Sequence, residues 1–279
     1  MTSRKSLSHL GLWAFGISAI LLGVTGLAWG DFATNWQRVQ QGVPFREVLA
    51  YLVAACELLS GLAIFWRRTA QAGAFFLTVL YSIFALLWVV QIFMSPQVYD
   101  NWGNFFEEFS LVAGGAVALA MLSTPESTWA SKRALFSRIY GVSVISFGAE
   151  HFIYFAGAAS WVPSWIPPGQ EFWTALTGTC FLMAAAAILS GVMAGLATRL
   201  LTVMIAGFEI LVWVPKLVAA PHDHFNWAGN TICIALAAAA WVVSDSINEL
   251  GEEYPALKLI GAPTEQSRRD QQSRTALRK

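Results

Sequence analysis

The chain has 279 residues, of which 56% are hydrophobic and only 12% are charged. Soluble domains usually carry about 25% charged residues, and a soluble fold of this size could not hide so much apolar surface. The composition therefore excludes a water-soluble globular protein and predicts one that crosses a lipid bilayer several times. The formal net charge of zero is uninformative, and we expect no nucleic-acid partner.

Eight apolar segments follow one another along the chain, most of them near the roughly 20 residues that span a bilayer. Most of the breaks between them contain proline, which ends helices. The first segment follows Arg4 and Lys5 like a signal peptide, but it recurs as an internal segment and is interpreted as retained. The segments are Leu12–Gly30, Arg46–Trp66, Ala70–Met94, Phe105–Ser123, Phe136–Gly157, Glu171–Met193, Leu196–Val218 and Trp227–Ser244.

Basic residues predict the orientation of these segments, because Lys and Arg accumulate on the cytoplasmic side of a membrane. Fourteen of the 17 fall on one side, and only Arg38, Arg46 and Lys216 fall on the other. We therefore expect both termini in the cytoplasm. The protein itself is expected in the inner membrane of a bacterium. The polar stretch after residue 245 is expected to be a short cytoplasmic tail.

An internal repeat gives the expected architecture. Gly141, Ser143 and Gly148 lie 125 positions after Gly16, Ser18 and Gly23, and Trp161 keeps that offset from Trp36. The offset then becomes 124, for example between Cys56 and Cys180. It returns to 125 for the pairs Asn101-Trp102 and Asn226-Trp227.

The repeat predicts an all-α membrane protein of eight transmembrane helices in two four-helix repeats. Because four is even, the repeats are parallel and related by a pseudo-twofold axis along the membrane normal. The expected divisions are a cytoplasmic N-terminus (1–11), a first repeat (12–123), a linker (124–135), a second repeat (136–245) and a tail (246–279).

Ionisable residues within apolar spans are the first candidates for a functional site, because they are costly in a bilayer. The ligand-site or proton-site candidates are Glu57, Glu150, His151, Glu209 and Lys216. None is repeated in the other half, where Glu150-His151 matches Thr25-Gly26. This asymmetry favours one composite site over a structural role, although drift after duplication gives the same pattern. Glu107 and Glu108 are expected to open the fourth helix.

A second group of candidates is expected near the outer surface: Asp31, Trp36, Arg46, Trp161, Trp165, His222 and His224. The aromatic and proline-rich loop Trp161–Pro168 is interpreted as an interfacial anchor, with a stiff lid as the alternative. The pattern His222-Asp223-His224 is a weak match to a metal site, so no metal is predicted. The three cysteines lack CxxC spacing and predict neither a disulfide nor a zinc site.

Several of these residues resemble the DoxX-like membrane proteins. The resemblance rests on Glu57 in Cys-Glu-Leu-Leu-Ser-Gly-Leu, the inner pair Arg67-Arg68, and His151-Phe152 followed by Val162-Pro163-x-Trp165-Ile166-Pro167, then Thr177-Gly178. It covers roughly residues 10 to 245 and implies a tandem member of a family built from four-helix units. Some relatives are subunits of thiosulfate:quinone oxidoreductases, which implies a quinone ligand and a redox partner subunit.

We therefore expect an accessory membrane protein that binds a small hydrophobic or quinone-like ligand, with a proton-coupled transporter of a small solute and a purely structural protein as alternatives. No phosphate-binding loop, nucleophile elbow or HExxH motif occurs, so no catalytic residues are predicted. If the protein is an enzyme, the expectation is a quinone-linked oxidoreductase subunit.

Overall fold

The computed structural model describes residues 10–253, and every regular element in that range is helical. The prediction of an all-α protein with membrane-spanning helices is confirmed. The elements are α1 (Leu10–Trp29), α2 (Arg46–Ala63), α3 (Ala70–Met94), α4 (Tyr99–Leu122), α5 (Thr128–Ser131), α6 (Arg133–Ile153), α7 (Phe155–Trp161), α8 (Gln170–Ser190), α9 (Ala194–Phe208), the π-helical turn η1 (Glu209–Trp213), α10 (Val214–Ala219) and α11 (His224–Glu253).

Among the described helices, six are long and apolar enough to cross a membrane, with α9 through α10 taken as one run. A seventh is gained if α6 and α7, which are bent by 97° at Tyr154, form one span. The more polar α2 is not in this group, so the eight spans stay a prediction. Residues 1–9 and 254–279, with Arg4, Lys5 and most of the expected tail, lie outside the described residues.

Three element boundaries differ most from the sequence prediction. The helix expected from Phe105 begins at Tyr99 instead. The stretch Asn101–Asn104 is polar and was therefore not assigned to the helix, but it is fully helical. The expectation that Glu107 and Glu108 open this helix was therefore wrong, and both lie about two turns inside it. The last helix continues past Ser244 to Glu253. The fifth segment turns sharply before Gly157 and continues as the short helix α7.

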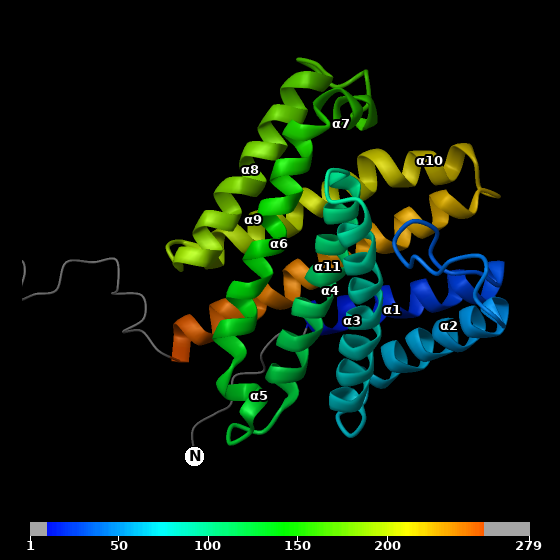
Figure 1. The fold of residues 1–279 in the computed structure, drawn as a ribbon. Helices are drawn as coiled ribbons and strands as arrows, with labels where there is room; N and C mark the ends of the chain where they lie inside the picture. The colour runs from blue at the N-terminus through cyan, green and yellow to red at the C-terminus, as the bar shows by residue number, and fades with distance from the viewer. Residues whose placement is uncertain (1–9, 254–279) are drawn as a thin grey trace, which may run out of the picture.

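The eight main helices form two layers that cross each other (Figure 1). In the first layer, α3, α4, α6 and α8 pack side by side in that order. In the second layer, the order is α2, α1, α11 and α9. The layers meet where α4 crosses α11, and α2 with α3 and α8 with α9 join them at the sides. Each layer therefore combines two helices from the first half of the chain with two from the second.

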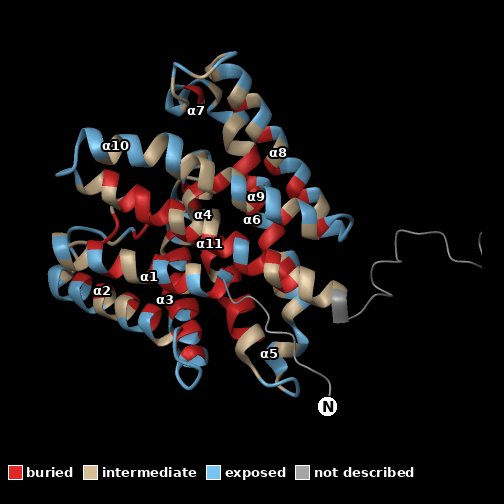
Figure 2. Cartoon of the chain, turned by 180° about the vertical axis from the view of Figure 1, so that it is seen from behind, coloured by how far each residue is buried: buried red, intermediate tan, exposed pale blue. Residues whose placement is uncertain are grey.

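Buried residues concentrate where α1, α4 and α11 meet at the centre of the molecule (Figure 2). Small residues allow this close approach. A Cβ added to Gly114 of α4 would lie 2.7 Å from Cβ of Ala239 in α11. Likewise, a Cβ on Gly23 of α1 would lie 2.5 Å from the carbonyl oxygen of Ala54 in α2. Such small-residue contacts are typical of helix packing in membranes, where close backbone approach supplies van der Waals energy.

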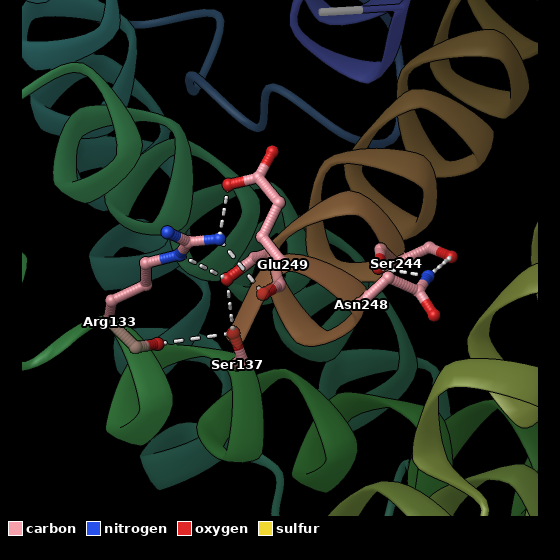
Figure 3. Close-up of polar contacts among 6 residues, drawn as sticks. Arg133, Ser137, Ser244, Asn248 and Glu249 are labelled. Atoms are coloured by element: carbon pink, nitrogen blue, oxygen red, sulfur yellow. Dashed lines mark hydrogen bonds and ion pairs between the residues drawn. The ribbon is translucent and has the colours of Figure 1, made fainter. Parts of the chain in front are cut away.

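One end of the molecule, called the α5 end, holds α5, the turn between α2 and α3, and the turn between α8 and α9. A partly buried ion pair joins α6 to α11 there (Figure 3). The guanidinium of Arg133 donates to Glu249 Oε2 at 2.6 Å, and it also donates to the hydroxyl and carbonyl oxygens of Ser246 at 2.9 Å. The hydroxyl of Ser137 lies 3.1 Å from that of Ser246 and completes the network.

We predict that Arg133→Ala lowers the free energy of unfolding by about 3–5 kcal/mol, because it leaves the partly buried carboxylate of Glu249 without its cation. The thermal unfolding midpoint of the detergent-solubilised protein measures this effect. Arg138→Ala, an exposed change one turn further along α6, is the matched control and is expected to leave the midpoint unchanged. Equal midpoints for the two variants would contradict a structural role for the Arg133 network.

Candidate functional site

The side chain of Glu107 lies inside the protein, where the loop of residues 30–45 folds against α4. Trp36 in that loop is only 8% exposed, and its indole nitrogen donates to Glu107 Oε2 at 2.5 Å. The backbone carbonyl of Trp36 in turn accepts from the indole of Trp88 at 2.9 Å. Trp36, expected near the outer surface, is therefore an interior residue that helps to fix the carboxyl group of Glu107.

A cavity of about 140 Å³ adjoins Glu107 between the two helix layers. It is lined by Trp36, Glu107, Phe147, His151, Phe181, Ile205, Phe208, Trp213, Gly229, Ile232, Cys233 and Leu236. Five of these twelve side chains are Phe or Trp, and only Glu107 and His151 are ionisable at neutral pH. A cavity of about 150 Å³ holds one benzene molecule. The site therefore has room for a single six-membered ring between aromatic walls.

The imidazole of His151 is held in one orientation by its own helix and by the aromatic wall. Its Nδ1 lies 2.7 Å from the carbonyl oxygen of Phe147, one turn earlier in α6. Its ring lies 5.2 Å from that of Phe181 and 6.3 Å from that of Phe208. A carbonyl oxygen can only accept, so Nδ1 must carry the proton. In the neutral imidazole, Nε2 is therefore a hydrogen-bond acceptor.

An aromatic cluster lies beside the cavity, toward the end that holds α7. Trp213 of η1 contacts both Trp36 and Trp161, with ring centroids 5.9 Å and 5.3 Å away. The ammonium of Lys216 lies 3.2 Å from the ring centroid of Trp161, which is a cation–π contact. Lys216 and Trp161 are thus neighbours of the cavity through Trp213, although neither lines it. The ammonium faces aromatic rings rather than a carboxylate.

Further carboxyl groups extend from Glu107 through the protein interior. The carboxyl group of Glu150 lies against Gly103, one turn before Glu107 on α4. In the other direction, Glu108 is close enough to Glu107 and Glu57 to interact electrostatically with both. Glu57 is 1% exposed, and its Oε1 accepts from Gln37 Nε2 at 2.5 Å. Four carboxyl groups from α2, α4 and α6 therefore follow one another through the interior.

Glu108 is the most unusual member of this row. It is 1% exposed, and neither carboxyl oxygen has a hydrogen-bond partner among the described residues. The hydroxyl of Tyr81 in α3 is likewise buried and without a partner, and it lies within electrostatic range of Glu57 and Glu108. An unsatisfied polar group inside a membrane protein costs several kcal/mol. Buried groups of this kind are retained at functional sites more often than in passive cores.

Glu209 lies beside the cavity, at the start of the π-helical turn. Its Oε1 accepts a short hydrogen bond from the side-chain amide of Asn230 in α11. It also lies beside the thiol of Cys233, which lines the cavity. Four of the five predicted interior candidates therefore surround one cavity: His151 lines it, and Glu150, Glu209 and Lys216 are adjacent. Glu57 lies further away, at the end of the carboxyl row.

The structure does not bring the remaining surface candidates into this site. Asp31, in the loop of residues 30–45, forms an ion pair at 2.6 Å with Arg46, the first residue of α2. The ring of His224 stacks on Trp29 with centroids 5.2 Å apart, while His222 and Trp165 are exposed. Among the described residues, no three His, Cys, Asp or Glu side chains are grouped closely enough to hold a metal ion.

Sequence reasoning left Glu107 and Glu108 out of the candidate set because it assigned them to the start of a helix. The missed indication was Asn101-Trp102, whose counterpart Asn226-Trp227 also lies in the first turn of a helix, α11. A helix beginning near Asn101 places both acids well inside that helix and not at its start.

Comparison of the sequence and the structure with models of protein families, with curated proteins and with solved structures finds no match.

Proposed function

We propose that this protein binds one small ring-bearing molecule with hydroxyl groups inside the membrane, and that the head group of a quinol is the best-fitting ligand. The observation that carries the proposal is the cavity of about 140 Å³ with Glu107 and His151 as its ionisable lining groups. The aromatic walls suit a ring, because aromatic pairs add about 0.5–1.5 kcal/mol beyond the area that they bury.

The hydrogen-bonding groups favour a ligand that donates. The imidazole Nε2 of neutral His151 can accept from a hydroxyl group, since Nδ1 donates to Phe147. The carboxyl group of Glu107 uses one oxygen to accept from Trp36, so its second oxygen is the natural acceptor for another hydroxyl. A hydroquinone has two hydroxyl groups on opposite sides of one ring. The oxidised quinone has only acceptors and matches this site less well.

The test is a binding comparison between tetramethylhydroquinone and its oxidised form, duroquinone, in detergent under anaerobic conditions. Trp36 and Trp213 line the cavity, so quenching of their fluorescence reports that the ligand is bound there. The variant Leu236→Trp, whose larger side chain fills the cavity, is the control for quenching at other sites. We expect the reduced form to bind at least tenfold more tightly. Binding of neither form would refute the proposed function, and tighter binding of duroquinone would refute the assigned hydrogen-bonding roles.

Proton-coupled transport of a small solute is the second candidate, and the carboxyl row is the observation that favours it. Glu57, Glu108, Glu107 and Glu150 lead through the interior past the cavity. Chains of carboxyl groups relay protons in transporters. Its test is solute uptake into proteoliposomes with an imposed pH gradient. Uptake that is indifferent to the gradient would eliminate this candidate.

We also propose that the chain is a duplicated four-helix unit, related to the DoxX-like proteins, which crosses a bacterial inner membrane eight times with both ends cytoplasmic. The pairwise packing supports duplication: α1 packs on α2 and α11 as α6 packs on α8 and α4. The turn η1 supports it too. A π-helical turn accommodates one extra residue, and η1 lies between residues 203 and 226, where the offset rises from 124 to 125.

The basic residues of the described part support the proposed orientation. Arg67 and Arg68 lie in the turn between α2 and α3, Lys132 and Arg138 lie at the start of α6, and Arg199 lies near the start of α9. These segments belong to the α5 end, which would face the cytoplasm. The cavity would then open nearer the outer surface. The lipid bilayer is the proposed environment, and a redox partner subunit, implied by the resemblance to DoxX-like proteins, is part of the proposal.

A further inference from the structure

A groove of about 810 Å³ runs along the outside of the second layer, between α9 and α11. Its walls are mainly apolar, and its polar residues lie at its two ends. Glu209 lies at one end, and Arg199 and Glu249 are near the α5 end. The lining residues are Ala14, Arg199, Thr202, Val203, Ala206, Glu209, Ile210, Ile234, Ala237, Ala238, Trp241, Ser244, Asp245, Asn248 and Glu249.

The groove faces the region that a bilayer would occupy. The run from α9 to α10 is the least buried of the candidate membrane spans, and Val203 and Ile210 on the groove are exposed. The hydrocarbon core of a bilayer contains no water to fill such a groove. Its occupant must therefore be an apolar chain, supplied either by a lipid or by a ligand that comes from the membrane.

The groove and the ring-sized cavity lie on two sides of the same helix contact. On α11, Leu236 lines the cavity and the next residue, Ala237, lines the groove. On α9, Ile205 lines the cavity and Ala206 lines the groove. At one end of the groove, Glu209 lines the groove while Cys233 beside it lines the cavity, and the hydrogen bond from Asn230 of α11 to Glu209 lies at this boundary.

The boundary lies at the one π-helical turn among the described residues. Such turns interrupt the regular hydrogen-bond ladder of an α-helix and often mark functional sites. Here the extra residue lies in η1, the segment that carries both Glu209 of the boundary and Trp213 of the cavity wall. The contact between α9 and α11 is therefore irregular at the level where the groove meets the cavity.

We propose that the ligand is an amphiphile with one apolar tail, which enters from the bilayer between α9 and α11 and keeps its tail in the groove while its ring occupies the cavity. This inference rests on the proposed function. The hydrogen bond between Glu209 and Asn230 is the contact that must open for the ring to pass. The position of the groove against the cavity, across one helix contact, favours this occupant over a membrane lipid, which would have no reason to end beside Glu209.

The test compares a tailless and a tailed ring, tetramethylhydroquinone and decylubiquinol, on three variants. Ala206→Trp and Ala237→Trp fill the groove from opposite helices, and Leu236→Trp fills the cavity. Tail burial adds little affinity by itself, because the bilayer or detergent is as apolar as the groove. A filled groove instead leaves the tail no place to lie while the ring is in the cavity. We therefore expect the groove variants to bind decylubiquinol at least tenfold more weakly and tetramethylhydroquinone within about twofold of the wild type. Leu236→Trp should lose both ligands.

The outcomes separate this inference from the function on which it rests. If the groove variants bind both compounds like the wild type, the tail does not lie in the groove, and a membrane lipid is its occupant, while the ring site stands. If the wild type binds neither compound, the proposed function fails. If the groove variants lose the tailless ring as well, they have distorted the cavity itself and the two sites are not separate, which also overturns the inference.

Discussion

Glu107→Gln is expected to weaken binding of tetramethylhydroquinone about 10- to 100-fold, and His151→Phe is expected to have a similar effect. Glutamine keeps the shape of the side chain, and its carbonyl oxygen still accepts from Trp36. Its amide group then points a donor at the ligand hydroxyl, so an acceptor is replaced by a donor. Leaving a buried hydrogen-bonding group without its partner costs about 1–3 kcal/mol, which corresponds to this change in affinity.

The same substitution should reverse the preference for the reduced ligand. The side-chain amide of the introduced glutamine can donate to the carbonyl oxygen of duroquinone, so the ratio of the two affinities should move toward the oxidised form. Quenching titrations with both compounds measure it, and Glu47→Gln, an exposed change in α2, is the matched control. If both affinities fell in proportion, Glu107 would support the cavity without facing the ligand.

Glu108→Leu is expected to stabilise the protein. The carboxyl oxygens of Glu108 are buried and lack partners among the described residues, so an apolar side chain of similar size removes a cost of about 1–3 kcal/mol. The thermal unfolding midpoint in detergent should therefore rise. Glu57→Leu is the matched comparison and should lower the midpoint, because it leaves the buried amide of Gln37 without its acceptor. A lower midpoint for Glu108→Leu would mean that water or an ion satisfies this carboxyl group.

The contrast between these two acids bears on function. A residue whose removal stabilises a protein is retained because it contributes something other than stability. For Glu108 that contribution would be proton exchange with Glu107, its neighbour on α4 and the carboxyl group at the ligand. Glu57 has both a structural partner and a place in the row, so its removal changes stability and proton exchange together.

The helical class and most of the helices could be predicted from the sequence, because apolar runs of about 20 residues have few alternative structures. The expected segment Ala70–Met94 coincides with α3. The polar start of α4 could not be recognised from hydropathy, which reports the environment of a segment and not its backbone conformation. The sharp bend at Tyr154 was also missed, since Phe136–Gly157 is mainly apolar and holds no proline.

The candidate site was predicted in part. The cost of ionisable groups in a membrane pointed to Glu150, His151 and Glu209, which all lie in or beside one cavity. The interior position of Trp36 could not be predicted, because it depends on how the loop of residues 30–45 folds back between the layers. The layered arrangement could not be predicted either, because a repeat in the sequence does not show which helices of the two halves pack against each other.

The most direct test of the ring site is a titration of tetramethylhydroquinone into two adjacent variants, Leu236→Trp and Ala237→Trp. Both residues lie on α11 and are partly buried, but only Leu236 lines the cavity. Isothermal titration calorimetry should give one binding site in the wild type and in Ala237→Trp, and no binding in Leu236→Trp. Binding to Leu236→Trp with the affinity of the wild type would contradict a ligand site between Glu107 and His151.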